Sequence, residues 1–151
     1  MPESGPYLTL AALCERALQE ADGTLSLIRL IDRVQINLAA TTAPGVAMPT
    51  IPAAPAIPLT FAVALKSGDF SGSQMLLVRI ETPSGFKVPD YRQKVTFEGE
   101  DRGATIVIPM QFPAQDEGVY WFVVELGDVV MTRVPLRIIK QTTQQTVPPQ
   151  L

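Results

Sequence analysis

The sequence predicts an all-β protein, an antiparallel sandwich of about seven to nine strands. Short runs rich in β-branched and aromatic residues recur along the chain, separated by Gly, Pro, Asp and Ser. The most apolar run, residues 118–126, is followed by Gly127-Asp128 and a second apolar run, residues 129–139, which is typical of a buried hairpin. With 151 residues and 46% hydrophobic content, the chain is long enough to bury one core.

The expected single domain covers residues 1–140. Within it, residues 39–58 are rich in Ala, Thr and Pro, and the last four prolines repeat every three residues, the period of polyproline II. We interpret this segment as a stiff connection along the sandwich edge, with a ligand for a proline-recognition domain as the less favoured alternative. Residues 141–151 are Thr, Gln and Pro without periodicity, so we expect a disordered tail.

Two N-terminal segments are ambiguous between helix and strand. Residues 8–21 place apolar side chains at helical spacing, which allows one short helix near the N-terminus, but Tyr7 to Leu10 would also begin a strand. Residues 27–38 are rich in β-branched types and favour a strand, with a helix as the alternative. Asp22-Gly23 between the two segments is a turn signal.

Further strands are expected after the Pro-rich segment, at residues 59–66, 74–82, 86–88, 94–97 and 104–112. Pro83-Ser84-Gly85 would turn the second of these back into the third. Pro109 points away from the apolar face of the last strand and indicates an edge or a bulge.

The start of the chain contains three connected motifs: Ala12-Leu13-Cys14, Asp22-Gly23-Thr24-Leu25-Ser26-Leu27-Ile28 and Ile31-Asp32-Arg33-Val34. This pattern resembles a family of small uncharacterised bacterial proteins, in which a strand ending near Cys, a loop ending in Asp-Gly and a strand ending near Asp lead into a β-sandwich. Arg29 stands where glycine is expected in that family. The resemblance, from Tyr7 to about Ile36, implies a sandwich, a bacterial source and no catalytic residue.

Asp116-x-Gly118-x-Tyr120-x-Phe122 has the spacing of the tyrosine corner of immunoglobulin-type domains. The expected fold is accordingly immunoglobulin-like, with Tyr120 and Phe122 pointing into the core. A two-residue turn at Gly127-Asp128 would place Phe122 opposite Arg133. A three-residue loop, Gly127-Asp128-Val129, would place it opposite Val134, and we prefer this loop because register follows the buried face.

That register directs one set of side chains outward, and Trp121 would lie opposite Pro135 within cation–π reach of two arginines. The patch is larger than a soluble monomer usually leaves bare. Either the N-terminal segment or the Pro-rich connection covers it, or it is an interface. The candidate interface residues are Val119, Trp121, Val123, Met131, Arg133, Pro135 and Arg137.

The residue types exclude much chemistry. The chain has no His, so Ser-His-Asp and Cys-His catalysis and His-ligated metals cannot be assembled from it. Cys14 is the only cysteine and is expected to be a small core residue. Carboxylates at Glu98, Glu100 and Asp101 lack the spacing of a calcium loop, so a solvated hairpin tip is favoured there. We expect no cofactor and no enzymatic activity.

Charge and hydropathy narrow the choice of partners. The net charge is −3 and the twelve Lys and Arg are scattered singly, which argues against nucleic acid. The N-terminus lacks a signal-peptide pattern and no apolar run is long enough to span a membrane, so a cytoplasmic protein is expected.

Three functions follow in order of preference. The first is a non-catalytic protein-interaction or structural module that self-associates or docks on a protein partner through the sheet carrying Trp121. The second is a carbohydrate-binding sandwich that stacks Trp121, Tyr91 or Tyr120 on a sugar. The least favoured is a hydrolase using two carboxylates, because these carboxylates lie at expected loop tips. They are Glu98, Glu100, Asp101, Asp116 and Glu117.

Overall fold

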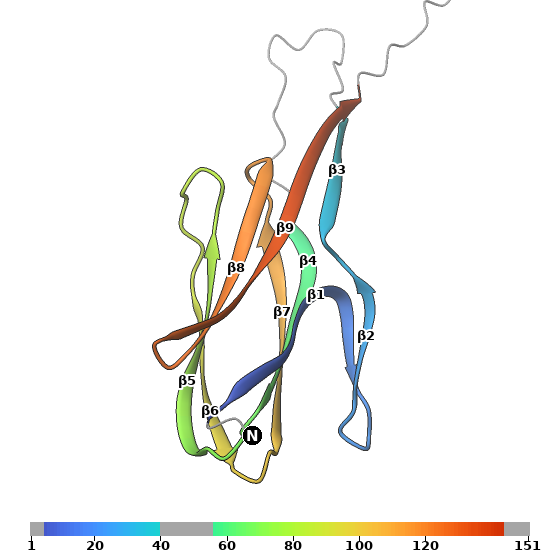
Figure 1. Ribbon diagram of the computed structural model, residues 1–151. Coiled ribbons are helices and arrows are strands. Elements are labelled where there is room, and N and C mark those ends of the chain that lie inside the picture. The colour runs from blue at the N-terminus through green and yellow to red at the C-terminus, as the bar shows by residue number, and fades with distance from the viewer. Residues whose placement is uncertain (1–4, 40–55, 144–151) are drawn as a thin grey trace, which may run out of the picture.

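The computed structural model describes residues 5–39 and 56–143, which form nine strands in two packed sheets (Figure 1). The prediction of an all-β sandwich is confirmed. The first sheet contains β1 (Tyr7–Gln19), β2 (Leu25–Leu30), β4 (Ala56–Lys66) and β7 (Gly103–Pro113), in the spatial order β2-β1-β4-β7. The second contains β3 (Arg33–Ala39), β5 (Ser71–Glu81), β6 (Tyr91–Glu98), β8 (Gly118–Leu126) and β9 (Val129–Thr143), in the order β3-β9-β8-β5-β6.

The two ambiguous N-terminal segments are strands. Most of residues 8–21 belongs to β1, and residues 27–38 divide into β2 and β3 at Ile31-Asp32. Neither helix alternative occurs between residues 5 and 39, including the short helix allowed near the N-terminus. The β-branched residues of the second segment, which stiffen the side chain at χ1, agree with this outcome.

One strand pair departs from the predicted antiparallel arrangement, because β3 runs parallel to β9. The chain leaves the edge of the first sheet after β2 and joins the edge of the second without reversing its direction. The backbone N–H of Arg137 donates to the Asp32 carbonyl at 3.0 Å as this parallel pairing begins. A strand that changes sheets in this way meets β9 in the same direction, so the sandwich contains one parallel pair.

Arg29 lies in β2, just before this change of sheet, with a φ of 55°, a left-handed conformation that glycine adopts most easily. Its guanidinium forms an exposed ion pair with Glu15 at 3.0 Å, which contributes only about 0–1 kcal/mol. We therefore expect Arg29→Gly to leave the free energy of unfolding unchanged or to raise it by up to about 1 kcal/mol. Arg29→Ala keeps the backbone strain, loses the ion pair and should lower that free energy. Urea denaturation of both variants tests this expectation, and a glycine variant less stable than the alanine variant would contradict it.

The strands after the Pro-rich segment follow the expected order, with one exception. Residues 86–88 are not a strand. The Thr82 hydroxyl donates to the Phe86 carbonyl at 2.7 Å, and the Phe86 ring packs edge-on against Tyr120 with 6.1 Å between ring centroids. Phe86 therefore turns toward the core instead of joining a ladder. Pro109 lies in β7, which is an edge strand as its sequence indicates.

The observed strands also set the boundaries of the domain. Residues 56–58, at the end of the expected connection, begin β4, and β9 continues through Thr143, three residues into the expected tail. Residues 40–55 and 144–151 lie outside the described part of the chain, and with them most of the predicted polyproline segment and most of the predicted tail.

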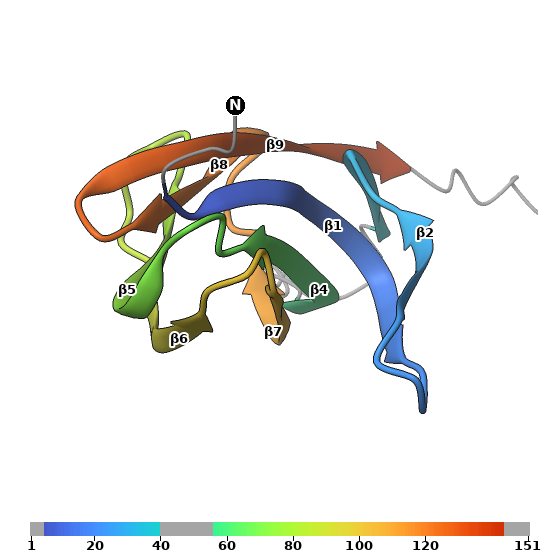
Figure 2. The same cartoon turned by 60° about the horizontal axis from the view of Figure 1, so that its bottom comes forward.

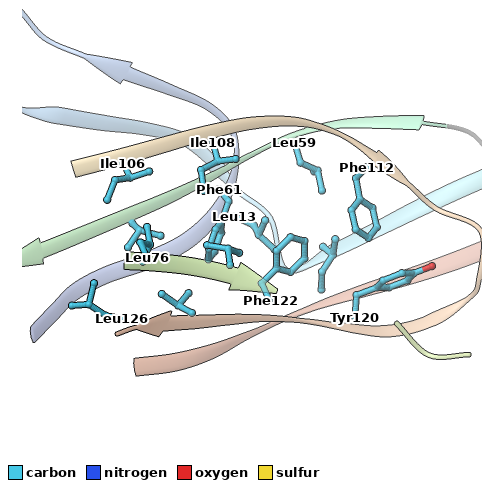
Figure 3. Packing of buried hydrophobic residues seen from close by; sticks show 14 of the residues in the cluster. Leu13, Leu59, Phe61, Leu76, Ile106, Ile108, Phe112, Tyr120, Phe122 and Leu126 are labelled. Atoms are coloured by element: carbon cyan, nitrogen blue, oxygen red, sulfur yellow. The ribbon is translucent and has the colours of Figure 1, made fainter. Parts of the chain in front are cut away.

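The core lies between the sheets and is centred on aromatic rings (Figure 3). Phe112 packs edge-on against Tyr120 with 4.9 Å between ring centroids, and Phe61 lies 5.4 Å from Phe122. The Tyr120 hydroxyl donates to the Asp116 carbonyl at 2.9 Å, which is the hydrogen bond of a tyrosine corner. The predicted inward direction of Tyr120 and Phe122 is confirmed, since both are fully buried.

The turn between β8 and β9 has two residues, Gly127-Asp128, so the predicted three-residue loop is wrong. Leu126 pairs with Val129, and a bulge in the next residues shifts the register by one. Beyond the bulge Phe122 pairs with Val134, as predicted. The reason for preferring the longer loop, burial of one face, held, but the extra residue sits in the strand instead of the turn.

The hairpin of β1 and β2 extends away from the two-sheet body (Figures 1 and 2). β1 pairs with β4 only as far as Cys14, and Arg16 to Gln19 pair only with β2. We call residues 15–30 the arm. The arm carries exposed apolar side chains at Leu18, Ile28 and Leu30. No helix long and apolar enough to cross a membrane occurs in residues 5–39 and 56–143.

Candidate functional site

The seven candidate interface residues come from the two neighbouring strands β8 and β9, and all but Met131 lie on the sheet face that points away from the core. We call this surface the outer face. The register pairs Trp121 with Pro135, Val123 with Arg133 and Val119 with Arg137. Alternation along a strand directs Tyr120 and Phe122 inward and therefore these residues outward. Six of the seven follow this alternation directly, whereas Met131 lies at the bulge, half-buried and packed against the core cluster.

Trp121 is the centre of the outer face and is half-buried. The guanidinium carbon of Arg133 lies 4.7 Å from the centre of its ring, a cation–π contact that the sequence predicted. The same guanidinium donates to a Glu81 carboxylate oxygen at 2.6 Å, and Glu81 is the residue opposite Trp121 on β5. The Trp121 ring, the Arg133 guanidinium and the Glu81 carboxylate therefore form one contact cluster across three strands.

Val123 faces the same side but is only 1% exposed. Its cross-strand neighbours are Arg79 on β5 and Arg133 on β9. Arg79 forms ion pairs with Glu125 at 3.2 Å and with Glu81 at 3.8 Å, which hold its side chain over the sheet. Long cationic side chains cover apolar surface with their methylene stems. The chain thus covers part of the predicted patch with its own charged side chains.

Several outer-face residues were missed by sequence reasoning. Arg79 and Glu81 belong here because β5 lies beside β8, and Arg33 belongs here because β3 lies beside β9. Exposed apolar side chains at Met75 and Val130 lie toward one end of the same face. Alternation within residues 74–82 does put Arg79 and Glu81 on one side of their strand. It carries no information on which strand is their neighbour.

Of the two tyrosines considered for sugar stacking, Tyr120 is excluded by its burial. Tyr120 is fully buried, its hydroxyl both donates to the Asp116 carbonyl and accepts from the Asp116 N–H, and burial raises its pKa. Tyr91 is half-buried and its hydroxyl donates to Gln93. Tyr91 and Trp121 remain as candidates, and Arg133 already occupies one face of the Trp121 ring.

The carboxylates considered for hydrolysis are each held by a local contact. Arg102 pairs with Glu98 at 2.6 Å and with Glu100 at 3.8 Å, and the Tyr7 hydroxyl donates to Asp101 at 2.9 Å. Ser84 donates to Asp116, and the Lys140 N–H donates to Glu117 at 3.2 Å. The described residues contain no group of three or more Cys, Asp or Glu side chains that could hold a metal ion.

Cys14 is completely buried, and burial raises the pKa of its thiol. A thiol with a raised pKa carries little of the reactive thiolate at neutral pH. This environment agrees with the prediction that Cys14 fills space in the protein.

A groove of about 610 Å³ lies beside the outer face, between the end of β5 and residues 82–90. Ile80, Phe86 and Val88 provide apolar walls, and Glu81, which contacts Arg133, lies on its rim. None of the carboxylates considered for hydrolysis lines this groove.

Comparisons with known proteins give similarity of fold only. No family model matches the sequence, and no curated protein matches it. The resemblance to the bacterial family therefore stays a prediction. Similar solved structures include the CARDB domain of a Pyrococcus furiosus protein in complex with di-metal ions, with 11% identity and a TM-score of 0.45, over 92% of this chain and 93% of that one.

Two further structures are similar at the same level. An immunoglobulin-like protein from Pseudomonas aeruginosa has 10% identity and a TM-score of 0.43, over 89% of this chain and 97% of that one. A β-glucosidase from Listeria innocua has 11% identity and a TM-score of 0.47, over 76% of this chain but only 15% of the enzyme. At these identities none of the three proteins assigns a site to this chain.

Proposed function

We propose that the protein is a non-catalytic interaction module that docks on a protein partner, or on a second copy of itself, through the outer face of the five-stranded sheet. The observation that carries this proposal is the cluster of Trp121, Arg133 and Pro135 in the middle of that face. Trp and Arg dominate the binding energy at the centres of protein interfaces. Arg133 is also held in place by Glu81, which lowers the entropy lost when a partner binds.

The absence of a catalytic role is part of the proposal and rests on the side chains. The carboxylates considered for catalysis are held by local contacts and do not line the groove beside β5. The two carboxylates that do line it, Glu81 and Asp90, are each in an ion pair, with Arg133 and Arg92 respectively. General acid–base catalysis needs a titratable group within hydrogen-bond reach of a bound substrate. A sugar-binding role is less favoured because Trp121 shares its ring face with Arg133.

Trp121→Glu tests the docking surface. Because Trp121 lies on the outer face, we expect the variant to keep the far-ultraviolet circular dichroism of the parent and a cooperative melt, with a loss of about 1–2 kcal/mol from the cation–π contact. A charge placed at an interface centre should abolish association. Leu30→Glu is the matched control, since Leu30 is an exposed apolar residue on the arm and should leave association unchanged.

Sedimentation velocity measures the mass in solution and therefore shows whether the protein self-associates. If the wild type self-associates, its mass should exceed 16.4 kDa and fall to that value in Trp121→Glu. If the wild type is a monomer, self-association is ruled out. Wild type and Trp121→Glu are then immobilised in parallel, and a partner is expected to bind the wild type and not the variant. An unfolded Trp121→Glu would overturn the proposal, because Trp121 would then be required by the fold.

A further inference from the structure

The strands of the outer face carry a charge opposite to that of the whole chain. Their outward positions hold more cationic side chains than carboxylates, for a net charge of +3, whereas the chain as a whole has a formal net charge of −3. The cations are Arg33, Arg79, Arg92, Lys94, Arg133 and Arg137, and the carboxylates are Glu81, Glu98 and Glu125.

The excess is concentrated where β3 meets β9. Arg33 and Arg137 are directly opposite each other in the parallel ladder, and both are exposed. Within the described residues neither has an ion-pair partner, whereas Arg79 and Arg133 are paired with Glu81 or Glu125. Like charges directly opposite each other destabilise a sheet unless a counter-charge is supplied.

This pair of arginines adjoins the Trp121 cluster. Arg137 lies opposite Val119 on β8, two residues from Trp121 along the same face. A partner seated on Trp121 would therefore lie next to two guanidinium groups without counter-charges. Guanidinium groups bind carboxylates through paired, charge-assisted hydrogen bonds, which lysine cannot reproduce.

We propose that the outer face takes an acidic segment of a partner protein, whose carboxylates bind Arg33 and Arg137 beside Trp121. This inference rests on the proposed function and adds the chemistry of the partner. A second copy in face-to-face contact is disfavoured, because each copy would bring the same net positive surface to the interface. A nucleic acid is disfavoured because Glu81 and Glu125 interrupt the cations, whereas a phosphate backbone follows a continuous positive track.

The probe is fluorescein-labelled decaglutamate, added to the full chain at low salt and followed by fluorescence anisotropy. Trp121 is the only tryptophan, so its intrinsic emission, followed with unlabelled decaglutamate, reports whether the peptide binds beside it. We expect saturable binding, a change in that emission, and a steep loss of affinity with added salt. Arg33→Ala/Arg137→Ala should weaken binding by about tenfold or more, because two charge-assisted contacts are lost.

Arg16→Ala/Lys66→Ala is the matched control, because it removes two cations from β1 and β4 of the other sheet and should change the affinity by less than about twofold. Circular dichroism checks that both double variants are folded. If Arg33→Ala/Arg137→Ala does not fold, Arg33→Gln alone is used and should weaken binding by about threefold.

Three results would overturn the inference. Decaglutamate could fail to bind the wild type, the two double variants could bind it equally well, or a thymidine decanucleotide could bind more tightly than decaglutamate. If Trp121→Glu is folded, any of these results contradicts the proposal of an acidic partner but not the proposal of a docking surface. If Trp121→Glu is unfolded, the proposal of a docking surface is contradicted, whether or not decaglutamate binds. The failure of one proposal can therefore be distinguished from the failure of the other.

Discussion

Phe122→Ala is expected to lower the free energy of unfolding by about 3–5 kcal/mol, a large part of the roughly 5–15 kcal/mol that stabilises a domain. Phe122 is fully buried, and its ring lies 5.4 Å from that of Phe61 and 5.8 Å from that of Phe112. Truncation removes these contacts and leaves a cavity between the sheets that the rigid strands cannot close.

Urea denaturation measures the loss for Phe122→Ala, and the midpoint of thermal unfolding should fall by about 10 °C. Val129→Ala is the control, because Val129 is 62% exposed and its truncation should change stability by less than about 0.5 kcal/mol. A Phe122→Ala protein that melts within a degree or two of the parent would mean that this ring does not fill the core.

Gly118→Ala is expected to have the next largest effect, a loss of about 2–4 kcal/mol. Gly118 begins β8 with a φ of +135°, where an L side chain is strained. A Cβ placed there would also meet the Cγ of Pro83 at 3.0 Å and its Cβ at 3.1 Å, and the proline ring cannot rotate away. The substitution should therefore push β8 and the turn at residues 82–85 apart.

Gly85→Ala separates the backbone strain of a positive φ from the steric contact with Pro83. Gly85 has a φ of +82°, but a Cβ at this position would have no atom within 4 Å. It should cost only the backbone term, about 1 kcal/mol. The difference between the two alanine variants, read from their urea midpoints, measures the contact with Pro83. Equal losses would show that the proline moves aside.

The sequence was sufficient for features that depend on which residues are buried. The inward direction of Phe122 followed from the tyrosine-corner spacing, and its pairing with Val134 followed because a slip of one residue would place the charged Arg133 opposite a core aromatic side chain. The tyrosine corner was equally accessible, since it is a local motif with a fixed spacing. Pro109, which cannot donate to a ladder, indicated an edge or a bulge, and β7 is an edge strand.

Features that depend on distant neighbours were not accessible. The turn with its bulge and the two-residue turn with no bulge begin from the same Gly127-Asp128 signal, and only the final packing decides between them. The outer face was predicted from one hairpin, so Trp121 was placed on it, whereas the bulge that turns Met131 toward the core and the counter-charges on β5 were missed. Arg33 lies beside Arg137 only because β3 crosses between sheets to pair with a strand about a hundred residues later.

The arm is expected to open and close while the rest of the domain stays folded. Residues 15–30 form a two-stranded ribbon for most of their length, and such ribbons are marginally stable without a second layer. Opening the arm breaks few buried contacts, so it can unfold locally while the aromatic core stays intact. In native-state hydrogen exchange, the amides of Leu25–Leu30 should therefore exchange through a low-energy opening, whereas those of β8 wait for the whole domain to unfold.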